Sequence, residues 1–202
     1  MIIKTITLAA LLTTGAALQA ATIFSENFDG VATGTYGSPT TIGQFSVASG
    51  TVDVVGNGFF GSLCNPAGPT NNCVDLNGNN AGSITSVGIN LLAGNYVLEF
   101  FLDGSHRGVA TSARVTLGAL VNQILNQASG DLNDVIIPFT SLSAQTVNLT
   151  FTSLGTGNLG PILDSVQIST ASGVPEPASM SLIGAGLVGL GLLARRRKQF
   201  QA

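Results

Sequence analysis

Between Thr22 and Thr170 the chain consists of short runs in which apolar and polar residues alternate, separated by glycine, asparagine and serine. In one run Val115 and Leu117 share a face, and in another Val147, Leu149 and Phe151 do so. Successive side chains of a strand point to opposite faces, so this period of two predicts strands with one buried face. The predicted strands are 22–28, 45–55, 95–102, 110–118, 135–139, 146–154 and 162–170.

The segment 118–128 is the only candidate for a helix in the body of the chain, and it is short. The body has no internal repeat, and the 26 glycines of the chain suit frequent turns. Many short strands joined by turns favour two antiparallel sheets packed face to face. We therefore predict an all-β fold, an antiparallel β-sandwich of the jelly-roll type, as one domain over residues 22–172.

Charge is scarce and one-sided in this chain. Only 8% of its residues are charged, against about 25% in ordinary domains. Residues 22–173 carry nine acidic side chains and two arginines, a net charge of −7. A body with that balance repels phosphate backbones, so nucleic acid is not an expected partner. The low charge density suits an exported protein.

Residues 1–20 have the layout of a secretory signal peptide, with one basic residue, Lys4, an apolar stretch over 6–18 and small residues up to Ala20. The apolar stretch of about 13 residues is shorter than the roughly 17–25 residues that span a bilayer. We therefore expect a signal helix that directs export by the Sec machinery and is cleaved near Ala20. An uncleaved anchor is the alternative.

Cys64 and Cys73 are the only cysteines, and they enclose a loop rich in proline, glycine and asparagine. In an exported protein such a pair is expected to form a disulfide. A metal site would need more soft ligands than a chain with a single histidine supplies.

Asp103, Ser105 and His106 lie within four residues and raise the question of a hydrolase. A catalytic triad draws its members from separate elements, so that the base lies between nucleophile and acid. We expect instead a polar turn, in which Arg107 pairs with Asp103 or with a loop carbonyl.

Two Gly-x-Gly-x-x-Gly matches, at 155–160 and 184–189, do not open a helix as phosphate binding requires. The chain is therefore not expected to be an enzyme.

The C-terminal segment combines "VPEP" at 174–177, an uncharged apolar stretch at 178–194 and a basic cluster at 195–198. As a helix, 17 residues at about 1.5 Å each would extend roughly 26 Å, enough to cross a thin bilayer. The positive-inside rule would hold the basic cluster in the cytoplasm. The segment predicts a single transmembrane helix, with the body outside the cytoplasm.

These three parts in this order resemble the PEP-CTERM sorting signal, over residues 173–198. The resemblance implies recognition by an exosortase, an integral membrane enzyme thought to cleave near the triplet. The sorting residues would be those of the triplet region and of the basic cluster: Val174, Pro175, Glu176, Pro177, Arg195, Arg196, Arg197 and Lys198. A permanent single-pass anchor is the alternative.

The body also resembles a family, through "NFDG", "GTVDVVG", "CVDLNG", "AGSI", "LLAGNYVLEFFLDGSHRG" and "NLGPILDSVQI" in this order. It is similar to the choice-of-anchor domains of PEP-CTERM proteins and to galactose-binding-like, DUF642-type jelly rolls. That resemblance implies a surface or matrix location, and galactose-binding-like sandwiches often carry a structural calcium ion near their terminal strands. Glu26, Asp29 and Asp164 are the candidate ligands for such an ion, and simply solvated carboxylates are the alternative. No other cofactor is expected.

We therefore expect a surface-sorted, non-catalytic component of an exopolysaccharide or biofilm matrix. It would pass through an inner-membrane intermediate and end at the cell surface or in the extracellular matrix. A carbohydrate-binding module is the alternative function and a hydrolase the third. Sugar binding would gain support if the aromatic residues gathered in one exposed groove: Tyr36, Phe59, Phe60 and Tyr96.

Overall fold

A computed structural model describes residues 20–56, 60, 63–64, 71–130 and 132–171. Residues 21–171 form one compact unit. Almost all of the signal peptide, Phe59 and the whole C-terminal segment lie outside the described residues. Within the described part of the chain no helix is long and apolar enough to cross a membrane.

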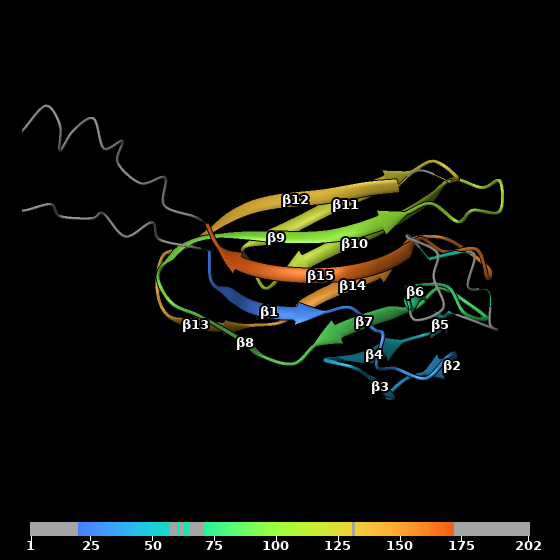
Figure 1. The fold of residues 1–202 in the computed structure, drawn as a ribbon, viewed down its shortest axis with the longest axis horizontal. Helices are drawn as coiled ribbons and strands as arrows, with labels where there is room; N and C mark the ends of the chain where they lie inside the picture. Colours follow the sequence, from blue (N-terminus) through green and yellow to red (C-terminus); the bar gives the residue numbers. More distant parts are fainter. Residues whose placement is uncertain (1–19, 57–59, 61–62, 65–70, 131, 172–202) are drawn as a thin grey trace, which may run out of the picture. The chain divides into compact units, whose positions relative to one another are not determined.

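Two antiparallel sheets pack face to face (Figure 1). We call them the β9 sheet and the β10 sheet. The β9 sheet has the order β12 (Leu132–Ser141), β9 (Gly94–Asp103), β15 (Ile162–Thr170), β6 (Cys73–Asp75), β5 (Thr51–Val55) and β2 (Gly34–Gly37), and β1 (Thr22–Glu26) also pairs with β15. The β10 sheet has the order β11 (Val121–Gln127), β10 (Thr111–Leu117), β14 (Leu149–Ser153), β7 (Ser83–Ser86), β4 (Phe45–Ser49) and β3 (Thr41–Ile42). A short ribbon pairs β8 (Ile89–Leu91) with β13 (Gln145–Val147). The prediction of an all-β antiparallel sandwich is confirmed.

The core lies between the sheets, where the inward side chains of the alternating runs meet. Leu98, Phe100 and Leu102 of β9 are fully buried, as is Phe151 of β14. The rings of Phe100 and Phe151 meet edge to face, with centroids 5.0 Å apart, and link the two sheets. Val115 and Leu117 are buried as the alternation predicted.

Two predicted strands are each split between different parts of the fold. The run 45–55 becomes β4 in the β10 sheet and β5 in the β9 sheet, and the run 146–154 becomes β13 and β14. The first division lies at Gly50, whose φ is 62°. A Cβ at this position would collide with the backbone of Ala81, so a glycine is required where the chain crosses between sheets. The helix candidate 118–128 contains strand β11, because its backbone pairs in antiparallel register with β10.

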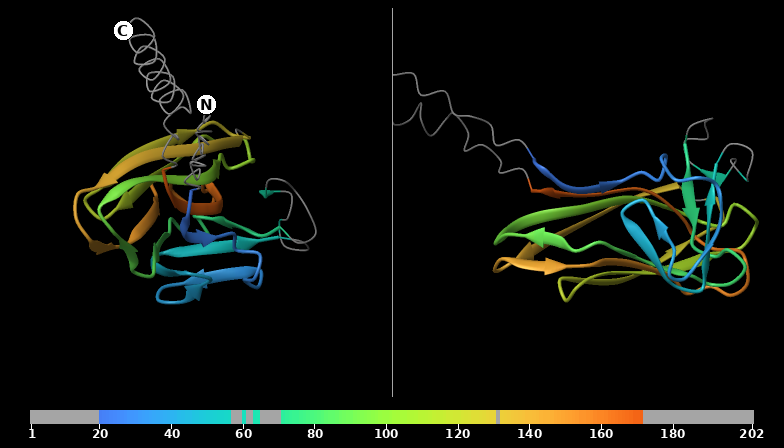
Figure 2. Two further views of the ribbon diagram at one scale, coloured as in Figure 1. Left: turned by 60° about the vertical axis from the view of Figure 1, so that its left-hand side comes forward. Right: turned by 90° about the horizontal axis from the view of Figure 1, so that it is seen from below.

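The first and last strands lie side by side, because β1 pairs with the C-terminal half of β15 (Figure 2). The N-terminal half of β15 pairs instead with β6. A register shift between Asp164 and Gln167, with Ser165 at φ 50°, separates the two halves. The described body therefore begins and ends at the same end of the sandwich.

Candidate functional site

The outer face of the β9 sheet carries an unusual row of acidic residues. Val52, Val54 and Val74 face the core, so the alternation turns Asp53 and Asp75 outward. The strand register places Asp53 opposite Asp75, Asp75 opposite Ile162, and Ile162 opposite Asp103. One row across four strands thus presents three carboxylates.

Leu63 and Cys64 lie against part of this face. Cys64 and Cys73 are joined by a disulfide, which confirms the prediction from the cysteine pair. Leu63 and Cys64 form a small apolar cluster with Val55, Cys73 and Ile162, separate from the main core. The disulfide and this cluster therefore attach Leu63 and Cys64 to the outer face of β5, β6 and β15.

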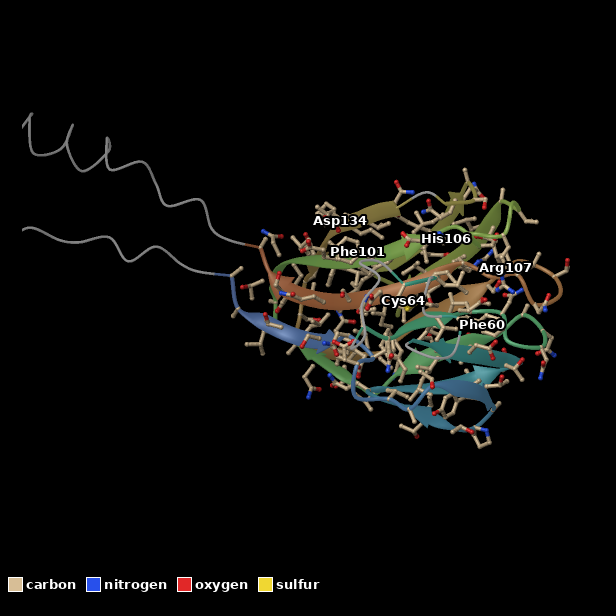
Figure 3. The ribbon with its side chains drawn as sticks, turned by 45° about the vertical axis from the view of Figure 1, so that its right-hand side comes forward. Phe60, Cys64, Phe101, His106, Arg107 and Asp134 are labelled. Atoms are coloured by element: carbon tan, nitrogen blue, oxygen red, sulfur yellow. A yellow bond between two sulfur atoms is a disulfide. The ribbon has the colours of Figure 1, made fainter. Side chains whose placement is uncertain are left out.

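A pocket of about 230 Å³ lies beside the covered patch. Phe60 stands at the pocket with 61% of its surface exposed, and its φ of 54° is uncommon for an aromatic residue. Figure 3 shows Phe60 and Arg107 at the end of the sandwich away from the start of β1. The polar lining residues come from three strands and three loops: Thr35, Asp53, Asp75, Asn79, Arg107 and Asn158.

Arg107 and Asp75 form an ion pair at the base of this pocket. Asp75 is 1% exposed, and its Oδ1 accepts a hydrogen bond from the backbone N–H of Asn77 at 2.9 Å. Burial raises the pKa of Asp75 to about 6, and the Asn77 amide and the Arg107 charge oppose that rise. On the same pocket wall Thr35 donates a second side-chain hydrogen bond, to Asp53 at 2.6 Å.

The expected pairing of Arg107 with Asp103 or a loop carbonyl is therefore wrong, since Arg107 reaches Asp75 on another strand. His106 lies beside Asp103 instead, with Nε2 3.5 Å from Oδ2. Ser105 is buried and its hydroxyl donates to the carbonyl of Val109 at 2.7 Å. Burial raises the pKa of Asp103, and the neighbouring imidazole of His106 opposes this. Asp103, Ser105 and His106 therefore belong to a polar turn in which the Ser105 hydroxyl is hydrogen-bonded to Val109 and not to His106.

The three carboxylates predicted for calcium are engaged in different ways. Glu26 accepts backbone N–H bonds from Phe28 at 2.8 Å and from Gln44 at 2.6 Å. Asp29 accepts from the backbone of Asn72 at 2.9 Å and contributes to raising the pKa of Asp164. The structure brings Asp29 and Asp164 together, and Glu26 ties β1 to the turn before β4.

Asp164 is 3% exposed, and its Oδ2 is buried without a hydrogen-bond partner. Burial raises the pKa of Asp164 to about 6. Over the described ranges no group of three or more His, Cys, Asp or Glu side chains is placed to hold a metal ion. The residues present do not form a three-carboxylate cage, and calcium at this position stays a prediction.

Tyr36, Phe60 and Tyr96, the aromatic candidates that the structure describes, do not line one groove. Tyr96 is buried in the core, where it stacks on Phe139 at 5.4 Å between ring centroids. Tyr36 packs against the core and donates to the carbonyl of Ala32. Of the candidates in the described part of the chain, Phe60 alone lines the pocket. The alternation of Tyr96 with Leu98 and Phe100 already indicates the inward direction of Tyr96.

Residues 173–198 match the PEP-CTERM protein-sorting motif. This match confirms the sorting signal that the sequence predicted over the same residues. No curated protein matches the chain.

The chain is similar in structure to several solved β-sandwich domains. The CBM22-1 xylan-binding domain of Xyn10C from Paenibacillus barcinonensis is 12% identical, with a TM-score of 0.49, over 79% of this chain and 100% of that one. A cleaved adhesin domain of Lys-gingipain from Porphyromonas gingivalis is 14% identical, with a TM-score of 0.46, over 76% and 100%. A family 35 carbohydrate binding module from Clostridium thermocellum is 14% identical, with a TM-score of 0.41, over 76% and 99%. The chain is thus a β-sandwich that carries a PEP-CTERM sorting motif.

Proposed function

We propose that this chain is an exported, non-catalytic β-sandwich protein that an exosortase-type membrane enzyme processes for delivery to an exopolysaccharide or biofilm matrix. The observation that carries the proposal is the PEP-CTERM match at 173–198. Within this motif, the apolar stretch 178–194 and the bases at 195–198 would hold the chain across the inner membrane after export by the Sec machinery. Cleavage near 174–177 would then free the body.

The geometry of the only histidine supports a non-catalytic role. His106 faces Asp103, but the nearby hydroxyl of Ser105 is committed to the Val109 carbonyl. An activated serine needs its hydroxyl within hydrogen-bond reach of the base. The loop that holds Ser105 and His106 therefore has the geometry of a structural turn and not of a hydrolytic site.

Replacing Pro175, Glu176 and Pro177 together by alanine tests the proposal in a host that carries an exosortase. The apolar stretch and the basic cluster remain, so the variant still enters the membrane. We expect it to accumulate unprocessed in the inner-membrane fraction, while the wild-type chain is recovered processed from the surface. Identical location and mass for the two chains would identify the segment as a simple linker to a permanent anchor.

A second candidate function is saccharide binding at the Phe60 pocket. An exposed aromatic ring beside carboxylate, amide and guanidinium groups suits a sugar, whose C–H face stacks while its hydroxyls form hydrogen bonds. The backbone of Phe60 lies in the left-handed region, and such conformations gather at ligand sites. A pocket of about 230 Å³ is below the ~300–1,000 Å³ of drug-sized sites. It would hold one sugar unit of a polymer.

A glycan array probed with the purified chain tests this second function. A glycan that binds is then titrated against Phe60→Ala and against Leu154→Ala, a matched control at an exposed apolar residue outside the pocket. We expect Phe60→Ala to bind about tenfold more weakly, equivalent to ~1.4 kcal/mol, and Leu154→Ala to bind normally. Equal binding by both variants would remove the pocket as the sugar site.

A further inference from the structure

Two exposed leucines stand at the end of the sandwich where the described chain begins and ends. Leu92 is 72% exposed and Leu142 is 89% exposed, the two most exposed large apolar side chains of the described residues. They occupy neighbouring turns, because the strands on either side of the turns pair with each other, β8 with β13 and β9 with β12. Single exposed leucines are common on protein surfaces, but two at adjacent turns form a local apolar tip.

Hydrogen bonds connect this tip to the point where the chain leaves the fold. The backbone N–H of Ala171 donates to the carbonyl of Asn95, and Thr140 donates to the Asn95 side chain at 2.8 Å. The hydroxyl of Tyr96 bonds to the backbone of Leu92. In Figure 1 the start of β1 and the end of β15 lie at this same end of the sandwich.

The tip carries no charge, although the body as a whole is acidic. The segments that form it, 20–25, 90–98, 135–148 and 166–171, contain no acidic, basic or histidine residue. The nearest acidic residue along β9 is Glu99, four positions from Asn95, or about 13 Å at the rise of a strand. The Debye length at physiological salt is about 8 Å, so an anionic surface at the tip would be largely screened from these carboxylates.

The length of the segment that follows limits how the body can turn. Six residues lie between Ala171 and Ala178, where the apolar stretch begins, so the two positions are at most about 25 Å apart. A body of this size is about 38 Å across. While the apolar stretch is held in a bilayer, the far end that carries Phe60 cannot exchange places with the tip.

We propose that the tip formed by Leu92 and Leu142 rests on the lipid bilayer while the chain is tethered by its C-terminal segment. The inference rests on the proposed function, because it needs the tether. Leucine side chains partition into the interface between headgroups and acyl chains, and an uncharged tip meets no repulsion from anionic lipids. This contact presents the 172–177 segment at the membrane surface, where an integral membrane enzyme can reach it.

The absence of tryptophan from the chain makes the test direct. Leu92→Trp and Leu142→Trp each introduce a single tryptophan at the tip. Leu154→Trp is the matched control, since the side chain of Leu154 is exposed at the opposite end of the sandwich. There the backbone N–H of Leu154 donates to the carbonyl of Ser112, near the start of β10. Each full-length chain is reconstituted into vesicles of phosphatidylethanolamine and phosphatidylglycerol with brominated acyl chains, which quench tryptophan on contact.

We expect quenching and a shift of emission to shorter wavelength for Leu92→Trp and Leu142→Trp, and neither effect for Leu154→Trp. Extraction of the vesicles with carbonate reports the tether separately. Chains that resist extraction but show no quenching at the tip, or equal quenching at all three positions, overturn the inference and leave the proposed function standing. Chains that carbonate removes overturn the tether, and with it the proposed function. Crosslinking of position 142 to a membrane protein in cells, together with no quenching by lipid, would overturn the bilayer contact and show that the tip contacts a protein instead.

Discussion

Asp75 and Asp164 are carboxyl groups that the fold removes from water, and both have a pKa raised to about 6. A raised pKa in the folded state means that the folded chain holds the proton more tightly than the unfolded chain. The resulting stabilisation is complete below the unfolded pKa, near 4, and is lost as the pH rises through about 6. Each group would therefore lower the free energy of unfolding by at most about 3 kcal/mol between pH 4 and pH 8.

Asp164→Asn should remove one of these two contributions. The amide keeps an oxygen that can accept the Ser165 N–H bond, and it carries no charge to bury. We expect the variant to be about 1–3 kcal/mol more stable than the wild type at pH 8 and nearly equal to it at pH 4. Denaturant titrations of both proteins at the two pH values measure the difference.

The same variant decides the calcium prediction. If Asp164 and Asp29 hold a calcium ion, the ion stabilises the wild type by mass action. A chelator would then lower the melting temperature of the wild type at pH 8, and Asp164→Asn would be destabilising there. No effect of calcium or chelator on the wild type would rule out a structural ion at this position.

Arg107→Ala should destabilise the chain in a pH-dependent way. Removing one partner of a buried ion pair leaves the other charge unpaired, which lowers the free energy of unfolding by about 3 kcal/mol. Asp75 can escape this penalty by taking up a proton at pH 5 but not at pH 8. We expect a large loss of stability at pH 8 and a small one at pH 5, whereas Arg114→Ala, at an exposed arginine of β10, changes little. Equal losses for Arg107→Ala at the two pH values would contradict the pairing with Asp75.

Strand content follows from local alternation, and strand partners do not. Val115, Leu117, Leu149 and Phe151 are buried as their period of two predicts. The same pattern cannot reveal that Gly50 divides one run between two sheets, because the collision that selects glycine there comes from Ala81, 31 residues away. Hairpin pairing with β10 makes 121–127 a strand, although the local sequence of 118–128 permits a helix.

The candidate site was only partly predictable, because its local features can be read from the sequence and its long-range contacts cannot. Two cysteines in an exported chain predict the disulfide, but not that Leu63 and Cys64 cover the outer face of the β9 sheet. Arg107 and Asp75 are 32 residues apart, and only the sheet register brings them together. The pairing therefore needed the fold, whereas the inward direction of Tyr96 could be read from its neighbours.

Reduction of the Cys64–Cys73 bridge should act on the outer cluster of Leu63 and Cys64 more than on the core. The bridge closes a loop of about 10 residues, which contributes about 2–3 kcal/mol by restricting the unfolded chain. We expect the reduced protein to unfold at lower denaturant concentration by that amount and to lose any binding at the Phe60 pocket. Hydrogen exchange in β9 and β12 should remain slow in the reduced protein at low denaturant. Free thiols in the protein as isolated from the periplasm would contradict the bridge.

The whole molecule divides its tasks between two regions. The body is acidic, with its ion pair and exposed aromatic ring at one end and an uncharged tip at the other. The sorting motif follows the tip directly in the sequence. The motif acts only while the chain is at the membrane, and the tip is proposed to rest on the bilayer during the same stage.

The intact mass of the wild-type chain recovered from the surface of a host that carries an exosortase tests the central claim. The account predicts a chain that lacks the signal peptide and ends near 174–177, without the apolar stretch and the basic cluster. The same chain from a host that lacks the enzyme should keep residues 178–202 and stay in the inner membrane. A surface chain that still carries Arg195 to Lys198 in the first host would contradict the account.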